Sequence, residues 1–241
     1  MKDTTILTVN WNQQPCVELL LKSFIKHHYC GEQFNLMLVD NDSTDNSKEW
    51  LVENDVPFVA MPKNLGHEQA INEIYGLLNT RYVLLLDTDV EFKSSIFRYF
   101  KRLVWNCISA GELIDNQYMN QDKVKDRVSP WFWLFDIKAM KERGVNTFRT
   151  KEDWSYDVGS EYWEKMSELG FVNYNIERFP GNQDQDIVSM KYETHDHIGK
   201  VSWNIYEKHQ DRIDEVQRRR NYVHERLELY KDIDLRNKFT L

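Results

Sequence analysis

Apolar and polar residues alternate in blocks over the N-terminal part of the chain, and each block has the length of a strand or a helix. Apolar runs rich in β-branched residues predict four buried strands, at residues 4–10, 34–40, 57–61 and 81–87. Apolar residues at helical spacing follow Pro15, recur at 48–53 and resume after Gly66. This alternation predicts parallel βαβ units with right-handed crossovers, and hence an α/β protein with an open, mostly parallel sheet flanked by helices.

The pattern is less regular beyond residue 89. Four further elements are predicted there: a helix at 94–104, an aromatic-rich strand at 131–137, a helix at about 159–169 and a strand at 171–177. From Trp203 onward, apolar residues at helical spacing predict a long amphipathic C-terminal helix. This helix would pack on the body or on a partner, such as a second copy of the chain. We interpret its basic run, Arg218 to Arg220, as a solvated face, with contact to anionic lipid or an acidic acceptor as the alternative.

Polar clusters follow three of the predicted strands directly. They read NWNQ after the first strand, DNDSTD after the second and DTDVE after the fourth. In open parallel sheets, ligands bind outside the carboxyl ends of the strands. We therefore expect these clusters to meet at one edge of the sheet and to form a site there.

Composition and charge narrow the classes of function. The formal net charge of −8 and the pI of about 5.4 argue against a general nucleic-acid binder. Three cysteines without zinc-type spacing indicate reduced thiols in a cytosol-like compartment. No apolar run approaches the about 20 residues of a membrane helix, and the N-terminus is too polar for a signal peptide. We expect a cytoplasmic protein without a transmembrane segment.

Asp87 and Asp89 are the first candidate site. Residues i and i+2 of an extended segment point to the same side, so both carboxylates can share one divalent cation. Oxygen ligands suit Mg²⁺ or Mn²⁺, which keep open positions for substrate phosphates. A solvated loop or a helix cap is the alternative interpretation.

The other strand ends offer ligands for a nucleotide. Asp40 can accept hydrogen bonds from a base and a ribose, and Asn10 and Trp11 can bond to or stack on a base. The turn that holds Asn64 and Gly66 precedes a helix start, which favours anions. Packing of Trp11 and a purely structural turn are the competing interpretations.

Four segments together resemble the nucleotide-sugar half of a family 2 glycosyltransferase with the GT-A fold: ILTVNWN, VDNDSTDNS, NLGHEQAIN and YVLLLDTDVEF. The resemblance covers about the first hundred residues. It implies that Asp40 and the end of the first strand bind the base, typically uridine, and that Asp87 and Asp89 form the D-x-D motif. That motif holds the diphosphate through Mn²⁺ or Mg²⁺, and sugar transfer from the nucleotide sugar to an acceptor hydroxyl inverts the anomeric carbon.

The same resemblance implies a GT-A-like catalytic domain over residues 1–200. Residues 1–105 would form its nucleotide-sugar half, 106–200 an α+β acceptor-side half, and 201–241 a C-terminal helical extension. The acceptor would be a glycan, a lipid-linked molecule or a small molecule. The sequence identifies neither the acceptor nor the sugar, and GDP and dTDP donors stay open beside UDP.

Two roles in the second half also follow from the resemblance. Asp157 matches a D-x-G form of the catalytic base motif, and Asp153 is the alternative in an E-D form. His197, with Gly199 and Ser202 after it, matches a late histidine that completes the metal shell or contacts the diphosphate; His195 is the alternative. Trp131 or Trp133 could stack on an acceptor sugar, although core packing is the default for at least one of them.

Two other functions compete with sugar transfer. DTDV also resembles the nucleophile motif of haloacid dehalogenase-type phosphatases, in which Asp87 would attack phosphorus. That family carries the motif on its first strand, whereas here three strands precede it. The second alternative is a nucleotide-binding module without catalysis.

Overall fold

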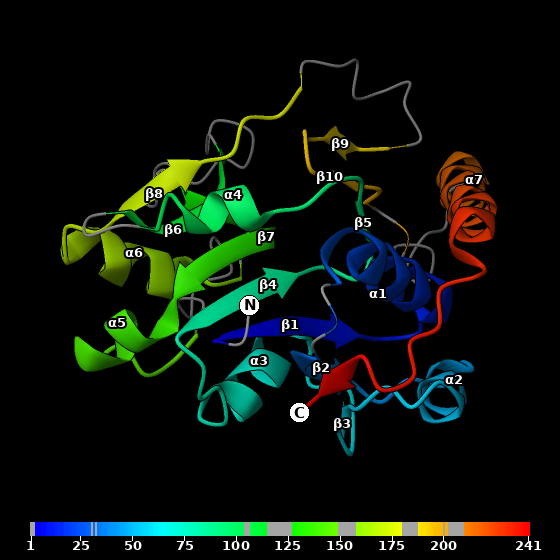
Figure 1. Cartoon of the computed structure of the whole chain (residues 1–241), viewed down its shortest axis with the longest axis horizontal. Helices are drawn as coiled ribbons and strands as arrows, with labels where there is room; N and C mark the ends of the chain where they lie inside the picture. Colours follow the sequence, from blue (N-terminus) through cyan, green and yellow to red (C-terminus); the bar gives the residue numbers. More distant parts are fainter. Residues whose placement is uncertain are drawn as a thin grey trace.

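A mostly parallel sheet forms the centre of the protein, with helices on both faces (Figure 1). The computed structural model describes residues 3–29, 31, 33–103, 107–114, 127–148, 158–179, 188–199, 201 and 210–241. Within these residues the sheet has eight strands, in the order β11-β2-β1-β4-β7-β6-β8 with β3 beside β2. The strands are β1 (Thr4–Asn10), β2 (Phe34–Asp40), β3 (Val59–Ala60), β4 (Tyr82–Leu86), β6 (Cys107–Ile114), β7 (Arg127–Asp136), β8 (Val172–Asn175) and β11 (Phe239–Thr240). The predicted α/β class with an open, mostly parallel sheet is confirmed.

The central strands separate two apolar cores. Ile6 of β1 packs in the core on the side of α1, whereas Leu7 packs in the core on the side of α3. Successive strand residues point to opposite faces, so a strand covered on both sides must be apolar throughout. The helices are α1 (Gln14–His28), α2 (Ser47–Glu53), α3 (His67–Tyr75), α4 (Phe97–Phe100), α5 (Ile137–Glu142), α6 (Ser160–Glu168) and α7 (Gln210–Leu227).

Strand β7 runs antiparallel to its neighbour β4. Its N-terminal part, and not its end, therefore lies at the edge where β1, β2 and β4 finish. Leu86 at the end of β4 pairs with Phe132, and the N–H of Asp87 donates to the carbonyl of Trp131 at 3.1 Å. The antiparallel direction thus brings an aromatic side chain from the second half of the chain to the strand ends of the first.

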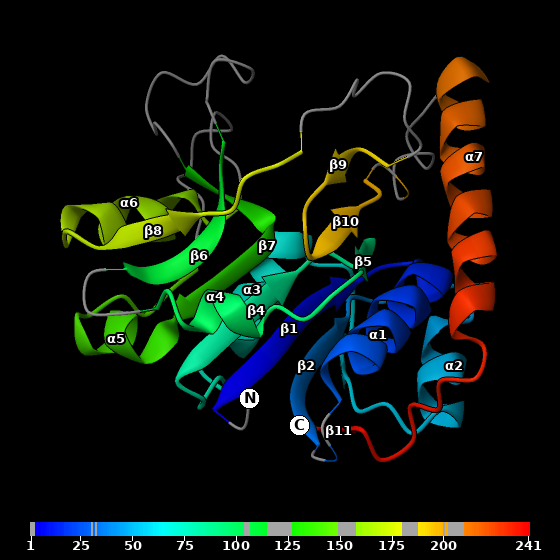
Figure 2. The same ribbon diagram turned by 45° about the horizontal axis from the view of Figure 1, so that its top comes forward.

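A second, three-stranded sheet continues from the end of β4. It consists of β5 (Val90–Phe92), β10 (His195–His197) and β9 (Met190–Lys191), paired in the order β5-β10-β9. The antiparallel register places His197 opposite Val90. Figure 2 shows this small sheet beside the tips of β1 and β4. Two segments about a hundred residues apart thereby meet next to Asp89.

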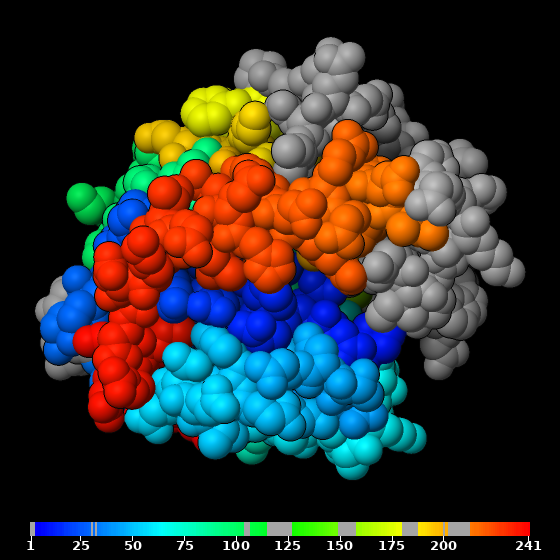
Figure 3. All heavy atoms as spheres, turned by 90° about the vertical axis from the view of Figure 1, so that its right-hand side faces the viewer, coloured from blue at the N-terminus to red at the C-terminus, as the bar shows by residue number. Residues whose placement is uncertain are grey.

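The C-terminal segment returns to the nucleotide-sugar half. Helix α7 lies across α1 (Figure 3), and Val223 packs with Cys16 and Leu19 of α1. A 3-10 turn (Glu228–Tyr230) follows, and β11 then pairs in parallel with β2. The predicted long amphipathic helix is present, and residues 201–241 also supply a strand of the main sheet.

Several predicted boundaries were wrong. The helix expected at 94–104 is reduced to the four residues of α4, because 94–96 lead out of β5 and the chain leaves the helix again after Phe100. The strand expected at 131–137 ends at Asp136, whose carboxylate accepts the N–H of Ala139 and caps α5. Strands β5, β6, β9, β10 and β11 were not predicted.

Candidate active site

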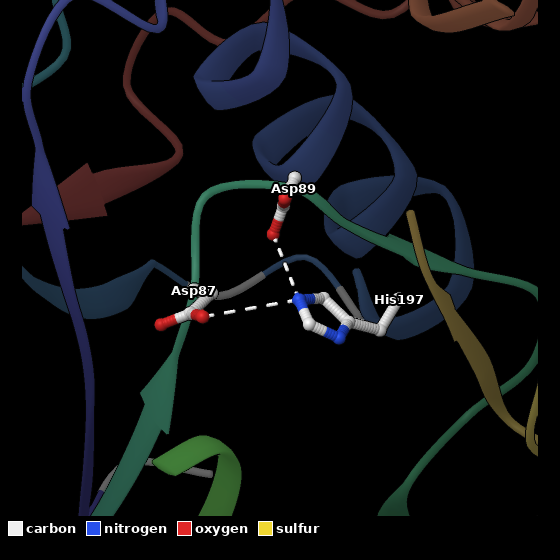
Figure 4. Close-up of side chains that lie close together, drawn as sticks. All are labelled: Asp87, Asp89 and His197. Atoms are coloured by element: carbon white, nitrogen blue, oxygen red, sulfur yellow. Dashed lines mark ion pairs between the residues drawn. The ribbon is translucent and has the colours of Figure 1, made fainter. Parts of the chain in front are cut away.

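Asp87, Asp89 and His197 point toward one another at the edge of the main sheet (Figure 4). His197 Nε2 lies 3.1 Å from Asp89 Oδ1 and 3.8 Å from Asp87 Oδ2. One ligand atom from each residue lies within 4.8 Å of the others. The predicted neighbourhood of the two aspartates and His197 is therefore present in the structure.

The aspartates converge through a turn and not through an extended segment. Asp87 follows the last residue of β4, and Thr88 and Asp89 form a turn before β5 begins. The two aspartates are close together, as predicted, but the turn brings them together and not the alternation of side chains along an extended segment. The backbone holds both sides of the cluster, because the N–H of Ile198 donates to the carbonyl of Asp89 at 3.0 Å.

The two acids and His197 shift the ionisation of their neighbours in this cluster. Burial alone disfavours the charged imidazole, but Asp89 and Asp87 outweigh it and raise the pKa of His197 above its ordinary value. Burial likewise opposes ionisation of Asp89, yet His197 lowers the pKa of Asp89. The acids thus stabilise the charged form of His197, and His197 stabilises the ionised form of Asp89. A divalent cation can replace the proton on the imidazole.

The donor set fits a divalent cation. Two carboxylates supply hard oxygen ligands, and the imidazole adds one nitrogen. All three are at least partly buried, with side-chain exposures of 29% for Asp87, 13% for Asp89 and 9% for His197. One side of the cluster faces the adjoining pocket, because Asp87 and Asp89 both line that pocket.

His195, the alternative metal ligand, lies outside this cluster. It is fully buried, stacked on Phe132 at 4.1 Å and on Tyr192 at 4.4 Å between ring centroids. Burial, with smaller effects of nearby cationic groups, lowers the pKa of His195 well below its ordinary value. Among the described residues, its contacts are those of a neutral histidine in the core.

Trp131 extends the site toward the acceptor-side half. Its ring stacks on His197 at 5.2 Å with an interplanar angle of 13°, and its Nε1 donates to Tyr192 Oη at 3.2 Å. Tyr192 in turn donates to Glu112 Oε2 at 2.7 Å, and burial raises the pKa of that carboxyl. Trp133, by contrast, is fully buried in the core. The expectation that at least one tryptophan packs in the core is therefore confirmed.

A pocket of about 300 Å³ opens beside the cluster. Trp11, Asn64 and Gly66, all predicted from the sequence, line it together with both aspartates. Asn41 also lines it and was missed: its Nδ2 donates to Asn64 Oδ1 at 3.0 Å, and its Oδ1 accepts the N–H of Leu65. Its position directly after a buried strand was the available signal. Gln13 and Thr88, which belong to the NWNQ and DTDVE clusters, also line the pocket, as does His67; the sequence analysis had not singled out any of the three.

Asp40 and Asn10 lie beneath the pocket wall and are not among its lining residues. Both are fully buried. Asp40 Oδ2 accepts Asn10 Nδ2 at 3.0 Å, and Asp40 Oδ1 accepts the N–H of Ser43 at 3.0 Å. In this structure the two residues hold the loop after β2 in place. Their direct contact with a base stays a prediction.

Helix α7 and the 3-10 turn after it hold β5, the strand that follows Asp89. Glu91 of β5 is fully buried, and Arg226 contacts it through two nitrogens, at 2.6 Å from Nη2 and 2.9 Å from Nε. Tyr230 Oη donates to the same carboxylate at 2.6 Å. Because Glu91 lies two residues after Asp89, this clamp fixes the strand next to the proposed ligand.

The basic run was misinterpreted for Arg219. This side chain is only 3% exposed and donates to the carbonyl of Ile198 and, at 3.0 Å, to Ser189 Oγ. Arg220 donates to the carbonyl of Val201, and Arg218 is exposed. The arginines were expected on a solvated face, but two of them donate hydrogen bonds to carbonyls of the segment after β10.

The predicted catalytic bases, Asp153 and Asp157, lie outside the described residues.

The chain resembles known proteins in sequence and in fold. Teichoic acid poly(glycerol phosphate) polymerase of Staphylococcus epidermidis is 27% identical over 106 residues, which are 42% of this chain. The matched part is 14% of the polymerase, so this chain corresponds to a small part of that relative.

No described helix is long and apolar enough to cross a membrane.

Solved structures share the fold at low sequence identity. The mannosyltransferase PcManGT of Pyrobaculum calidifontis, in complex with GDP-Man and Mn²⁺, superposes with a TM-score of 0.56 at 15% identity, covering 72% of this chain and 54% of that one. S. aureus TarS 1–349 gives a TM-score of 0.52 at 13% identity, over 70% of this chain and 56% of that one. The bifunctional glycosyltransferase WbbM gives 0.52 at 12% identity, over 91% and 44%.

The family description "Glycosyl transferase family 2" matches residues 5–147, more than half of the chain. The match includes the DTDV segment, which is thereby assigned to this family and not to the phosphatases. The predicted GT-A fold and enzyme class agree with it. This chain belongs to glycosyl transferase family 2.

Proposed function

We propose that this chain is a metal-dependent glycosyltransferase that moves a sugar from a nucleotide donor, most simply a UDP-sugar, to an acceptor hydroxyl with inversion. The observation that carries the proposal is the cluster of Asp87, Asp89 and His197 on the wall of a pocket at the strand ends. Parallel α/β sheets bind their ligands at this edge.

In this proposal Asp87, Asp89 and His197 hold Mn²⁺ or Mg²⁺. The cation supplies positive charge to the departing nucleoside diphosphate. PcManGT was solved with Mn²⁺ and a nucleotide sugar, which supports this pairing of ligands. His197 adds a nitrogen to the oxygen ligands, and this favours Mn²⁺ over Mg²⁺.

The base and the sugar diphosphate would occupy the adjoining pocket. Trp11 offers a ring for stacking, and Asn41 and Asn64 offer polar atoms on the same wall. Asn10 and Asp40 contribute from below by holding the loop after β2. None of the described lining residues is Lys or Arg, so the diphosphate needs the cation to offset its charge.

Transfer is a single displacement. The acceptor oxygen attacks the anomeric carbon and forms the new C–O bond, while the C–O bond to the diphosphate breaks and its electron pair leaves with the nucleotide. The hydroxyl proton goes to a carboxylate, for which we propose Asp157, with Asp153 as the alternative.

A thermal-shift panel tests the proposal. Nucleoside diphosphates and nucleotide sugars, UDP-, GDP- and dTDP-linked, are compared with and without Mn²⁺. A donor at about 100 times its Kd adds about 2.7 kcal/mol of stability and raises the Tm by several degrees. Asp89→Asn should lose the Mn²⁺-dependent part of that rise. Asp55→Asn, the same chemical change on an exposed turn, should retain it. An unchanged Mn²⁺-dependent rise in Asp89→Asn would contradict the metal assignment.

A further inference from the structure

A second hollow, of about 810 Å³, lies on the α1 side of the sheet and is separate from the pocket beside Asp87 and Asp89. It is bounded by α4 and the two residues after it, the end of β8 with the chain that follows, and the turn between β9 and β10. Its lining contains four cationic side chains and only two carboxylates. The cations are Arg98, Lys101, Arg102 and Arg178, and the carboxylates are Glu177 and Glu193. This local excess of positive charge is notable because the whole chain carries −8. We name it the basic groove.

The cations of the groove differ in how far they are already engaged. Arg98 pairs with Glu193. In the part of the chain that the structure describes, Lys101 and Arg102 have no carboxylate partner, and both are exposed. Arg102 stacks over Tyr174 at 5.1 Å from the ring centroid. Two adjacent cations therefore remain available for an anion, and a guanidinium with stacked planar geometry is well suited to phosphate.

Aromatic surface accompanies these charges. Tyr174 and Phe179 line the groove, and Phe179 is 53% exposed. Aromatic rings bind the apolar faces of sugars and carbon chains, whereas the cations bind phosphate. The groove thus combines the two kinds of contact that a phosphate-bearing carbohydrate or polyol chain requires.

Arg178 connects the groove to the active site. Its Nε lies 3.1 Å from Glu112 Oε1, on a carboxylate that is only 9% exposed. Glu112 accepts from Tyr192, Tyr192 accepts from Trp131, and Trp131 stacks on His197. A continuous series of contacts between side chains thus runs from the groove to the proposed metal ligand His197.

We propose that the basic groove binds the acceptor, and that the acceptor carries phosphate groups, as in a chain of sugars or polyols joined by phosphodiester bonds. This rests on the proposed function, because an acceptor subsite presupposes a sugar transferase. A phosphate sits on Lys101 and Arg102, a carbon skeleton packs on Tyr174 and Phe179, and the hydroxyl end extends past Arg178 toward Trp131. A concave groove with two carboxylates in its lining fits a chain better than a flat anionic bilayer.

Binding of defined probes tests the proposal. Calorimetric titration at low salt compares a tetramer of glucose units joined by phosphodiester bonds with neutral maltotetraose, using the full chain without donor. The charged tetramer should bind at least tenfold more tightly, because the cations of the groove can form charge-assisted hydrogen bonds with phosphate oxygens and not with a neutral sugar chain. Lys101→Ala/Arg102→Ala should weaken its binding at least tenfold. Lys138→Ala/Lys165→Ala, which removes the same charge from α5 and α6, should change it less than twofold.

Equal affinity for the two tetramers, or an unaffected double variant with a normal Tm, would overturn the proposal. Binding of phosphatidylglycerol vesicles that is lost in the double variant, without binding of the charged tetramer, would overturn it in favour of a membrane surface. The same wild-type sample is titrated with UDP and GDP in the presence of Mn²⁺. Nucleotide binding without tetramer binding defeats the acceptor assignment alone, whereas absence of both defeats the proposed function.

Discussion

His195 and His197 lie two residues apart on β10, and the structure gives them opposite surroundings. His195 is stacked between Phe132 and Tyr192 in the core, and its pKa is lowered chiefly by burial. His197 faces Asp89 and Asp87, and these acids raise its pKa despite burial. Both side chains are largely buried, so burial does not distinguish the roles. The roles are distinguished by the groups that face each ring, and all of these except Tyr192 are distant in sequence.

Removing the ring of His195 should have the largest effect, and it should be on stability. His195→Ala leaves a cavity between two aromatic rings, and truncation of a buried ring costs about 4 kcal/mol of unfolding free energy. Urea unfolding measures the loss. His195→Phe keeps a ring in the stack and should cost less than about 1.5 kcal/mol, with Mn²⁺ affinity retained. A large loss of Mn²⁺ affinity in His195→Phe would erase the distinction between the two histidines.

The matching change at His197 should act on metal affinity instead. His197→Gln removes one of three donors, and we expect Mn²⁺ to bind about 100-fold more weakly, a change of about 2.7 kcal/mol. Titration followed by Mn²⁺ electron paramagnetic resonance gives the affinity directly. The unfolding free energy in EDTA should change less than in His195→Ala. Unaltered Mn²⁺ binding would remove His197 from the proposed metal shell.

The smallest effect, and the sharpest contrast, is in the pH dependence of the metal-free protein. A raised folded pKa stabilises the protein below the ordinary value of 6.5, and this contribution is lost as pH rises through the raised pKa. A lowered folded pKa does the reverse, so stability is lost as pH falls below 6.5. The stability difference between wild type and His197→Gln should shrink as pH increases from 5.5 to 8.5. The difference between wild type and His195→Phe should shrink as pH decreases, and the same trend in both would refute the assignment.

The donor-side half could be predicted because its signals are local. Apolar runs such as residues 82–86 are buried on both faces, and helices at regular spacing dictate parallel strands. The parallel arrangement then brings Asn10, Asp40 and Asp87 to one edge without further information. Trp11, Asn64 and Gly66 were placed correctly at the pocket by this reasoning.

The remaining features depend on pairings that the pattern does not show. Strands β9 and β10 have only two and three residues, too few for a periodicity, and β10 pairs with β5 far away in sequence. Arg219 lies in a charged run that is typical of a solvated face. Its side chain is nevertheless buried, because it donates to the carbonyl of Ile198, which would otherwise lack a hydrogen bond. Asp40 accepts hydrogen bonds from Asn10 and from the N–H of Ser43, and these contacts could not be predicted from the sequence pattern.

The clamp between Glu91 and Arg226 also has a consequence for synthesis. The two residues are 135 positions apart, and a ribosome adds about 5–20 residues per second. Glu91 therefore waits roughly ten seconds for its cation, and β2 waits still longer for β11 at its edge. Until then the β5 carboxylate has to stay in water, because burying an unpaired charge is too costly. The turn that holds Asp89 can therefore take its final form only after Arg226, 135 residues beyond Glu91, has been made.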